Sequence, residues 1–226
     1  MISIIVPVYN EEVGLKSFIS YLQKHTSGEK AELIFIDGGS TDKTVEICKE
    51  LGYKIYTSPI RGRASQMNYG AEKSTGDILY FLHADSIPPK SLIKDILKSI
   101  DEGCIAGCYR LAFEPELPLL KLYAWFTRFD NNLFRFGDQS LFVTRRAFEK
   151  VGGFDQNLKV MEDQQIVVDL KKEGKFKIMN NKIATSSRKY NKVGVLKLQL
   201  IFTIIVIFYY LGVSQKVMAD FYSKQV

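Results

Sequence analysis

The chain has 226 residues, 46% of them hydrophobic and 25% charged, an ordinary globular composition that suffices for one substantial core. Its net charge of +6 does not indicate a nucleic-acid-binding protein, because the basic residues are scattered and form no stripe interleaved with aromatic residues; a phosphate-bearing small molecule or an anionic membrane surface explains the charge equally well. The three cysteines, Cys48, Cys104 and Cys108, lack the pairing and the nearby histidine that a disulfide framework or a zinc site requires.

The first hundred residues alternate short apolar runs with segments of helical period, the pattern of βαβ units around a mostly parallel sheet. We expect strands at residues 2–6, 33–36, 53–57 and 78–82. We expect helices at residues 13–25, 41–51, 64–74 and from the Pro88-Pro89 pair through residue 100. The predicted fold class is therefore α/β.

The middle of the chain has a different character, and we expect it to shape the second half of a cleft. The pattern predicts a strand at residues 104–113, a turn at 114–118 and an aromatic-rich helical stretch at 119–136. It then predicts a strand at 139–144, a short helix at 146–151 and a longer helix that opens at residues 161–165. We assign residues 1–190 to one domain.

The C-terminal segment, residues 191–226, is an apolar helical tail. No charged residue occurs between Lys197 and Lys216, a length at the edge of the roughly 20 apolar residues that a membrane span needs. A buried or dimer-forming helix and a helix in the bilayer interface are the alternatives. The N-terminus lacks the regions of a signal peptide, so we expect a cytoplasmic protein, at the inner face of the cell membrane if the tail binds lipid.

Polar residues follow three of the predicted strands where each strand ends. They are Pro7-Val8-Tyr9-Asn10-Glu11-Glu12, Asp37-Gly38-Gly39-Ser40-Thr41-Asp42 and His83-Ala84-Asp85. Parallel strands place their carboxyl ends along one edge of a sheet, and ligands bind in the crevice outside that edge. We therefore expect these three strand ends to converge on one ligand, a nucleotide. This interpretation requires that Asp37 and Asp85 border a single cavity together with Asp163, which begins a later predicted helix.

Two of these strand ends carry specific chemistry. Asp37 precedes two glycines, so its carboxylate is free to accept a pyrimidine N–H, although an aspartate here also commonly caps the turn. His83 and Asp85 point to the same side of an extended chain and suit a Mg²⁺ or Mn²⁺ ion that bridges a diphosphate. The alternative is a turn-capping Asp85 beside a structural histidine.

Later residues supply candidates for phosphate binding and for acid–base chemistry. Arg61, Arg63 and Asn68 flank Gly62 and suit phosphate or base oxygens, or else are solvated surface. Glu162 and Asp163 begin a helix, whose dipole favours ionised carboxylates there. One of them can therefore serve as a general base beside the other, or both are ordinary charges at a helix N-terminus. Asp138 and Gln139 are expected to face the acceptor.

Together these motifs resemble the family 2 glycosyltransferases over most of residues 1–190. The resemblance implies the GT-A fold, a Rossmann-like three-layer sandwich, and an inverting displacement on a nucleotide-diphosphate-sugar donor, with a UDP-sugar favoured and Mn²⁺ or Mg²⁺ as cofactor. By position, the resemblance implies that the nucleoside is held by Pro7, Tyr9, Glu11 and Asp37, and that Arg61 or Arg63 contacts the base or phosphate. It implies further donor contacts from His83 and Ala84. It also implies that Asp85 binds the metal and that Asp163 is the general base.

The sequence departs from the family pattern at two positions. Gly38 stands where the family usually has a second aspartate, and His83 replaces the first aspartate of the usual Asp-x-Asp, so metal affinity or donor choice is expected to differ. Residues 62–68 together with Gly137-Asp138-Gln139 resemble a small bacterial subgroup, some members of which are associated with arsenosugar biosynthesis.

Two other functions are compatible with these residues. A nucleotidyltransferase can have a similar sheet and metal–diphosphate site, but it often has a glycine-rich basic loop after the first strand, where this chain has Asn10-Glu11-Glu12. A catalytically silent nucleotide-sugar-binding protein or membrane scaffold is favoured by His83 and the apolar tail. The sequence does not identify the acceptor, whose contacts we expect from the aromatic residues of 123–136.

Overall fold

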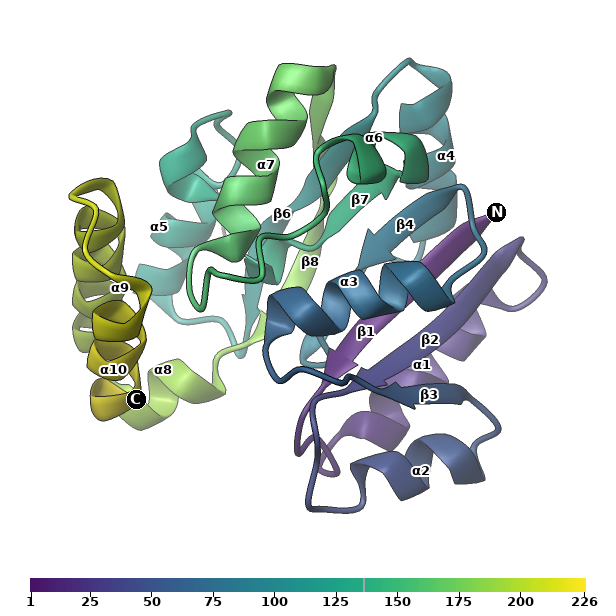
Figure 1. The fold of residues 1–226 in the computed structure, drawn as a ribbon, viewed down its shortest axis with the longest axis horizontal. Coiled ribbons are helices and arrows are strands. Elements are labelled where there is room, and N and C mark those ends of the chain that lie inside the picture. The colour runs from purple at the N-terminus through teal and green to yellow at the C-terminus, as the bar shows by residue number, and fades with distance from the viewer. Residues whose placement is uncertain (136) are drawn as a thin grey trace.

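The protein, described by a computed structural model over residues 1–135 and 137–226, forms one eight-stranded sheet within those residues (Figure 1). In chain order its strands are β1 (Ile2–Val8), β2 (Ala31–Asp37), β3 (Lys54–Thr57), β4 (Ile78–Phe81), β5 (Ser86–Ile87), β6 (Ala106–Glu114), β7 (Leu141–Thr144) and β8 (Phe176–Ser186).

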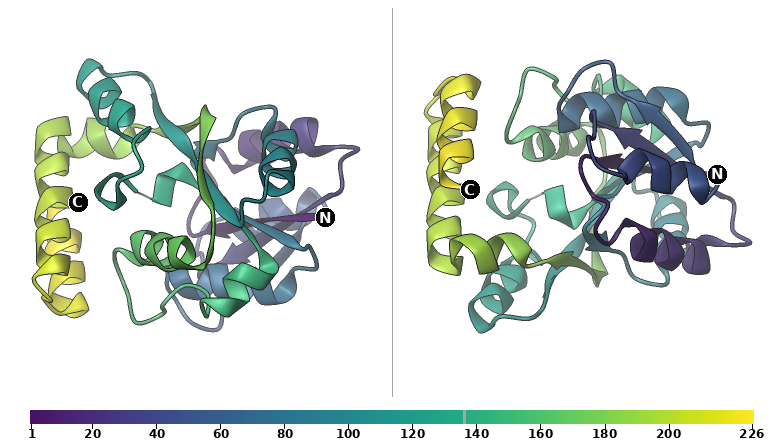
Figure 2. Two further views of the ribbon diagram at one scale, coloured as in Figure 1. Left: turned by 90° about the horizontal axis from the view of Figure 1, so that it is seen from above. Right: turned by 90° about the horizontal axis from the view of Figure 1, so that it is seen from below.

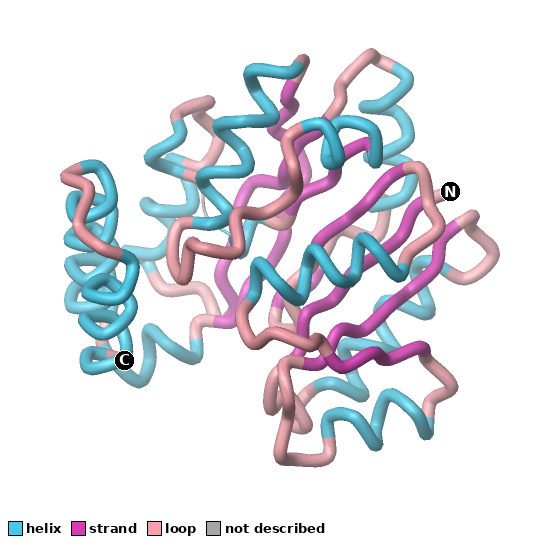
Figure 3. Tube along the Cα trace, in the orientation of Figure 1, coloured by secondary structure: helices cyan, strands magenta, loops and turns pink. Residues whose placement is uncertain are grey.

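The helices connect the strands and cover the sheet, as Figure 3 shows by colour. They are α1 (Leu15–Thr26), α2 (Thr44–Glu50), α3 (Arg63–Lys73), α4 (Leu92–Asp101), α5 (Pro118–Phe126), α6 (Arg145–Lys150), α7 (Glu162–Glu173), α8 (Arg188–Val193), α9 (Val195–Tyr210) and α10 (Gln215–Gln225), with the short 3₁₀ turns η1 (Asn132–Phe134) and η2 (Gly137–Gln139).

The sheet has the order β3-β2-β1-β4-β7-β6-β8-β5. Strands β3, β2, β1 and β4 are mutually parallel, and β6 and β8 are parallel to each other, whereas β7 is antiparallel to both of its neighbours and β5 is antiparallel to β8. The predicted α/β class with a mostly parallel sheet is confirmed. Because β1, β2 and β4 are parallel, their carboxyl ends meet at one edge.

Each face of the sheet has its own apolar core. Alternate residues of β1 point to opposite faces, so Ile4 and Val6 join one cluster and Ile5 joins the other. Helices α3, α6 and α7 cover the face toward the viewer in Figure 1, through residues such as Met67 and Ile166. Strands buried on both faces have continuous apolar runs, which is why the sequence predicts β1, β2 and β4 so directly.

The predicted helix at residues 119–136 is wrong beyond α5. That helix ends at Phe126 because the Thr127 hydroxyl donates to the carbonyl of Ala124 at 2.6 Å and accepts the amide of Leu111 at 3.0 Å, which turns the chain back toward β6. Phe136, the last residue of the predicted stretch, lies outside the described residues.

The predicted strand at 139–144 is also too long. Residues 137–139 form the turn η2, Ser140 has a positive φ of 58°, and β7 begins only at Leu141. No element is predicted from the sequence for residues 176–186, where β8 pairs along β6. The apolar alternation of β8 is interrupted by Asn180, Asn181 and Lys182, opposite a register shift in β6, so no regular strand pattern is visible in the sequence.

The predicted apolar tail forms two helices, α9 and α10, which lie side by side at one end of the molecule (Figure 2). One side of α9 is buried in the core through Leu198, Ile201 and Ile205. Tyr209 donates to the side chain of Gln165, and Tyr210 donates to that of Gln164 at 3.3 Å, so α9 is tied to the start of α7. Among the described residues, no helix combines the length and the apolar character that a membrane crossing requires.

Candidate functional site

A cleft of about 420 Å³ opens at the carboxyl ends of β1 and β4, within the usual size range of small-molecule sites. Its position outside the ends of parallel strands is the one predicted from the sequence. The residues that line it are Pro7, Val8, Tyr9, Glu11, Arg63, Gln66, His83, Ala84, Asp85, Ser186, Arg188, Lys189 and Lys192.

The loops after β1 and β2 are held together by hydrogen bonds. The amide of Thr41 donates to Oδ1 of Asn10 at 2.8 Å, and the amide of Asn10 donates to the hydroxyl of Ser40 at 3.0 Å. The amide of Glu11 donates to the hydroxyl of Thr44 at 2.8 Å. The polar residues that follow the two strands thus stabilise one shared rim of the cleft.

Gln66 stabilises this rim from within the core, a role that was not predicted from the sequence. Its buried amide nitrogen donates to the carbonyls of Val8, at 3.0 Å, and Ile36, at 2.8 Å, and so connects α3 to the ends of β1 and β2. A glutamine within the buried side of a predicted helix was the available signal.

Asp37 caps the turn after β2. It is only 2% exposed, and its two carboxylate oxygens accept the amides of Gly39 and Ser40, each at 3.0 Å. The guanidinium of Arg61 lies over the same turn, 3.5 Å from where a Cβ of Gly39 would be. Neither Asp37 nor Arg61 is among the residues that line the cleft; both lie behind its rim.

Two carboxylates, Glu11 and Asp85, face each other in the cleft. Burial raises the pKa of Glu11 and the charge of Asp85 raises it further, while Arg188, at 3.6 Å, opposes the rise. Among the described residues, no group of three or more His, Cys, Asp or Glu side chains forms a metal cage. One or two carboxylates do fit a Mg²⁺ or Mn²⁺ ion whose other ligands are phosphate oxygens and water.

The opposite wall of the cleft is basic and comes from α8. Arg188, Lys189 and Lys192 all line it. These residues were not predicted from the sequence, although three cations within five positions just before the apolar tail were the available signal. A diphosphate carries negative charge that such a wall neutralises.

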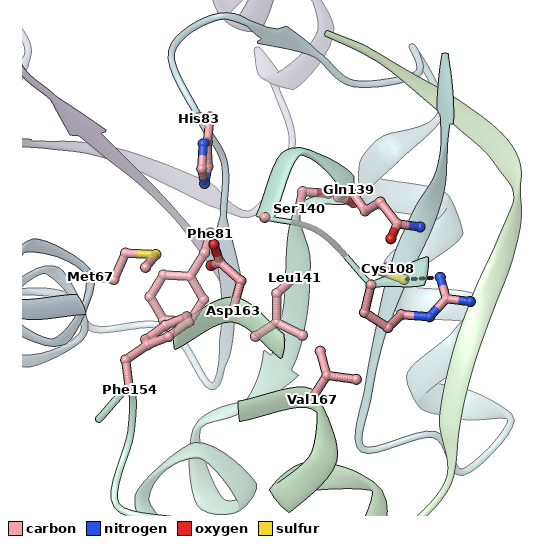
Figure 4. A pocket seen from close by; sticks show the side chains of 12 residues that line it. Met67, Phe81, His83, Cys108, Gln139, Ser140, Leu141, Phe154, Asp163 and Val167 are labelled. Carbon is pink, nitrogen blue, oxygen red and sulfur yellow. Dashed lines mark hydrogen bonds between the residues drawn. The ribbon is translucent and has the colours of Figure 1, made fainter. Parts of the chain in front are cut away.

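His83 lines both the cleft and a second, smaller cavity of about 20 Å³, enough for one water molecule or one hydroxyl (Figure 4). The carboxylate of Asp163 lines this small cavity and points toward His83 in Figure 4. His83 also has a second acidic neighbour, because its Nδ1 lies 3.8 Å from Oδ1 of Asp138. Burial raises the pKa of Asp138; His83 opposes the rise and the charge of Asp85 adds to it.

Gly137 allows this close approach of the Asp163 carboxylate. A Cβ at Gly137 would overlap Oδ2 of Asp163, would lie 2.7 Å from its Cγ, and would lie 3.2 Å from Cε1 of His83. The turn η2 and the start of α7 therefore fit together only with glycine at this position.

Glu162 pairs with Arg63 across the site. Glu162 is 1% exposed and forms an ion pair in which Nε of Arg63 lies 2.9 Å from its Oε1, while neither carboxylate oxygen has a partner with hydrogen-bond geometry among the described residues. Burial raises the pKa of Glu162 to about 7; Arg63 opposes the rise and Asp163 adds to it. The ion pair fixes the start of α7 against the start of α3. It also fixes the position of the Arg63 side chain, which lines the cleft.

The raised pKa of Glu162 predicts a pH-dependent stability. The folded protein holds this proton more tightly than the unfolded chain, in which the glutamate has its ordinary pKa of 4.5, so the contribution is complete below pH 4.5 and is lost as pH rises through about 7. Urea titrations measure the free energy of unfolding at each pH. We expect the value for the wild type, relative to that for Glu162→Gln, to fall by on the order of 3 kcal/mol at most over that pH interval. The exposed Glu29→Gln is the control; wild-type and Glu162→Gln curves that stay parallel would contradict the assignment.

Two predicted site residues have structural partners instead of a place in the cleft. The side chain of Asn68 donates to the carbonyl of Phe154 at 2.8 Å and accepts its amide at 2.9 Å. Gln139 is buried and donates to the carbonyl of Tyr109 at 3.1 Å, while it also lines the small cavity. The single cavity expected for Asp37, Asp85 and Asp163 is divided: Asp85 lines the cleft, Asp163 lines the cavity beyond His83, and Asp37 lines neither.

The fold and the position of the cleft define a GT-A-type glycosyltransferase fold, and known structures agree. Glucosyl-3-phosphoglycerate synthase from Mycobacterium tuberculosis, solved with Mn²⁺, UDP and glucosyl-3-phosphoglycerate, matches with a TM-score of 0.67 at 18% identity over 94% of this chain and 80% of that chain. S. aureus TarS 1–349, solved with UDP-GlcNAc, matches with a TM-score of 0.67 at 18% identity over 83% of this chain. This chain spans only 58% of that TarS chain. These likenesses show the fold.

The sequence comparisons give the family. The model of glycosyl transferase family 2 matches residues 3–152. An uncharacterized glycosyltransferase of Haemophilus influenzae is 33% identical over 207 residues, which are 86% of this chain and 81% of that protein. The chain therefore belongs to glycosyl transferase family 2, and glycosyl transfer is the function that this membership supports.

Proposed function

We propose that the protein transfers a sugar, with inversion, from a nucleotide-diphosphate-sugar donor to an acceptor hydroxyl. The observation that carries the proposal is that His83 lines both the donor-sized cleft beside Asp85 and the cavity that contains Asp163. A donor in the cleft would place its anomeric carbon near His83, and the acceptor hydroxyl would approach from the side of Asp163.

A UDP-sugar is the donor that we favour. The support comes from proteins of the same fold, since TarS was solved with UDP-GlcNAc and the mycobacterial synthase with UDP. In this chain, Pro7 and Tyr9 would flank the nucleoside, with Asp37 and Arg61 holding the turn behind it. Lys189 and Lys192 would neutralise the diphosphate, as would Arg188.

The acid side of the cleft is where a divalent ion would bind. Asp85 would hold it, with Glu11 as the nearest second carboxylate. Bound there, Mn²⁺ or Mg²⁺ would offset the charge that grows on the leaving diphosphate. The mycobacterial synthase was solved with Mn²⁺, as was a mannosyltransferase of Pyrobaculum calidifontis, which supports this cofactor class.

Asp163 would act as the general base. Its carboxylate would accept the proton of the acceptor hydroxyl as the oxygen attacks the anomeric carbon from the face opposite the diphosphate, and attack from that face inverts the configuration. His83, between Asp163 and Asp85, would separate the acceptor proton from the leaving group.

The predicted likeness to the arsenosugar-associated subgroup stays a proposal about the substrate. The two segments that support it both contact the start of α7, since Arg63 of the first pairs with Glu162 and Gly137 of the second lies against Asp163. This common neighbour favours a shared function of the two segments without identifying the sugar.

A panel of labelled nucleotide-sugars tests the function. The protein with Mn²⁺ should hydrolyse or transfer the sugar of at least one UDP-sugar, and the product should have the inverted anomeric configuration by NMR. Transfer of a nucleotide in place of a sugar would overturn the proposal, and so would binding of every donor without turnover in the presence of cell-extract acceptors.

Asp85→Ala and Lys189→Gln should weaken UDP binding in different ways. We expect Asp85→Ala to remove the gain in UDP affinity that Mn²⁺ provides, a loss on the order of tenfold or more, because a carboxylate ligand is lost. Lys189→Gln should lower affinity with and without Mn²⁺, and more so at low salt. Isothermal titration calorimetry measures both, and an unchanged Mn²⁺ effect in Asp85→Ala would count against Asp85 as the ligand.

A further inference from the structure

Helix α9 leaves a long apolar stripe uncovered on the side opposite its buried residues. The stripe consists of Leu196, Leu200, Ile207 and Tyr210 of α9 and of Leu211, which directly follows the helix. Thr203, whose hydroxyl donates to the carbonyl of Gln199 at 2.9 Å, lies among them. Leu196 is 71% exposed, Leu200 61%, Ile207 50% and Leu211 74%. Exposed aliphatic residues in a continuous row, in contrast to scattered ones, mark a surface that contacts another apolar phase.

The C-terminal segment also has a net positive charge. Residues 191–226 include four Lys but one acid, Asp220, so they account for +3 of the net charge of +6. Lys192 lines the cleft. Lys197 lies beside the stripe, next to Leu196, and Lys216 and Lys224 are on α10, which packs along α9. The surroundings of the uncovered stripe therefore contain three lysines and one acid.

We infer that this surface docks the protein on an anionic lipid bilayer, with α9 lying in the interface. An exposed apolar stripe bordered by lysines suits the surface of a bilayer with anionic headgroups, because the stripe can reach the acyl chains while the lysines stay among the headgroups. At 16 residues, α9 is about 24 Å long and too short to span the roughly 30 Å hydrocarbon core. The inference goes beyond the proposed function and does not depend on it.

A second copy of the chain fits this surface less well. Pairing through one helix of this length buries far less than the roughly 800 Å² per partner of a stable interface. It would also bring two C-terminal segments of net charge +3 together. An anionic bilayer satisfies the apolar stripe and the lysines at once.

Vesicle flotation of the full chain, without any substrate, tests the inference. The wild type should float with vesicles of phosphatidylcholine and phosphatidylglycerol, and several-fold less with phosphatidylcholine alone. Leu200→Glu combined with Ile207→Glu should lower binding to the anionic vesicles by on the order of tenfold or more. Lys197→Gln with Lys216→Gln should lower it and weaken its dependence on salt.

Leu97→Glu is the matched control, because Leu97 is 41% exposed on α4 and away from the C-terminal segment. It should bind vesicles like the wild type. Circular dichroism and thermal unfolding should show that all variants remain folded, which their exposed positions favour. Vesicle binding by Leu200→Glu/Ile207→Glu equal to that of the wild type would overturn the inference. The inference would also be overturned if the wild type bound neither kind of vesicle and formed a dimer in analytical ultracentrifugation, and if Leu200→Glu/Ile207→Glu abolished that dimer.

Discussion

Replacing Asp163 by Asn should reduce the rate of sugar transfer by about 10² to 10⁴, while UDP affinity stays near the wild-type value. Asparagine keeps the shape of the side chain but does not accept the proton of the acceptor hydroxyl. Donor binding should persist because Asp163 lines the small cavity beyond His83 and not the cleft. Steady-state turnover and calorimetric UDP binding, measured on the same samples, separate the two effects.

Asp169→Asn is the matched control for that experiment. Asp169 lies on the same helix, where it accepts hydrogen bonds from Lys172 and Gln165, and it is not among the residues that line either cavity. This variant should keep both turnover and UDP affinity. Turnover that survives in Asp163→Asn would show that another group accepts the proton.

Replacing Gly137 by Ala should lower turnover by on the order of 10², the cost of moving a catalytic group by about 1 Å. The new methyl group would overlap Oδ2 of Asp163 and approach His83, so the carboxylate has to leave its position in the small cavity. UDP affinity should change little, because Gly137 does not line the cleft. The measurement is turnover against UDP affinity, with the fold checked by circular dichroism.

Gly174→Ala separates the effect on Asp163 from a general cost of adding a methyl group. Gly174 has an extended backbone with φ of 169°, and the nearest atoms to a Cβ there belong to the side chain of Ile105, at 3.1 Å or more. It should leave turnover intact. A Gly137→Ala protein as active as Gly174→Ala would mean that the Asp163 carboxylate tolerates displacement, and the assigned geometry of the base would be wrong.

The first half of the fold follows from the sequence because its strands are buried on both faces. Ile4 and Ile5 belong to different clusters, so β1 has to be apolar throughout, and its end is marked where the polar residues begin. The second half does not follow as directly. Strand β8 pairs with β6 across a register shift, and its central asparagines erase the alternation by which a strand is predicted from sequence.

The site was predictable to the extent that it lies at strand ends. Tyr9, Glu11 and Asp85 line the cleft as their positions after β1 and β4 imply. Contacts between distant segments were not predictable from the sequence. The sequence suggests Arg63 as a phosphate ligand, whereas the structure shows that its guanidinium pairs with Glu162. The basic wall of α8 was missed for the same reason: nothing local in residues 188–192 tells which strand ends they will face.

The hydrogen bonds from Tyr209 and Tyr210 to Gln165 and Gln164 have a practical consequence for anyone who shortens the chain. A protein cut before α9 would bare the core surface that Leu198, Ile201 and Ile205 seal, and it would free the helix that presents Asp163 from two of its restraints. The C-terminal helices therefore support α7 as well as forming an outer surface. A version that lacks them would be a poor substitute for residues 1–226 in kinetic work.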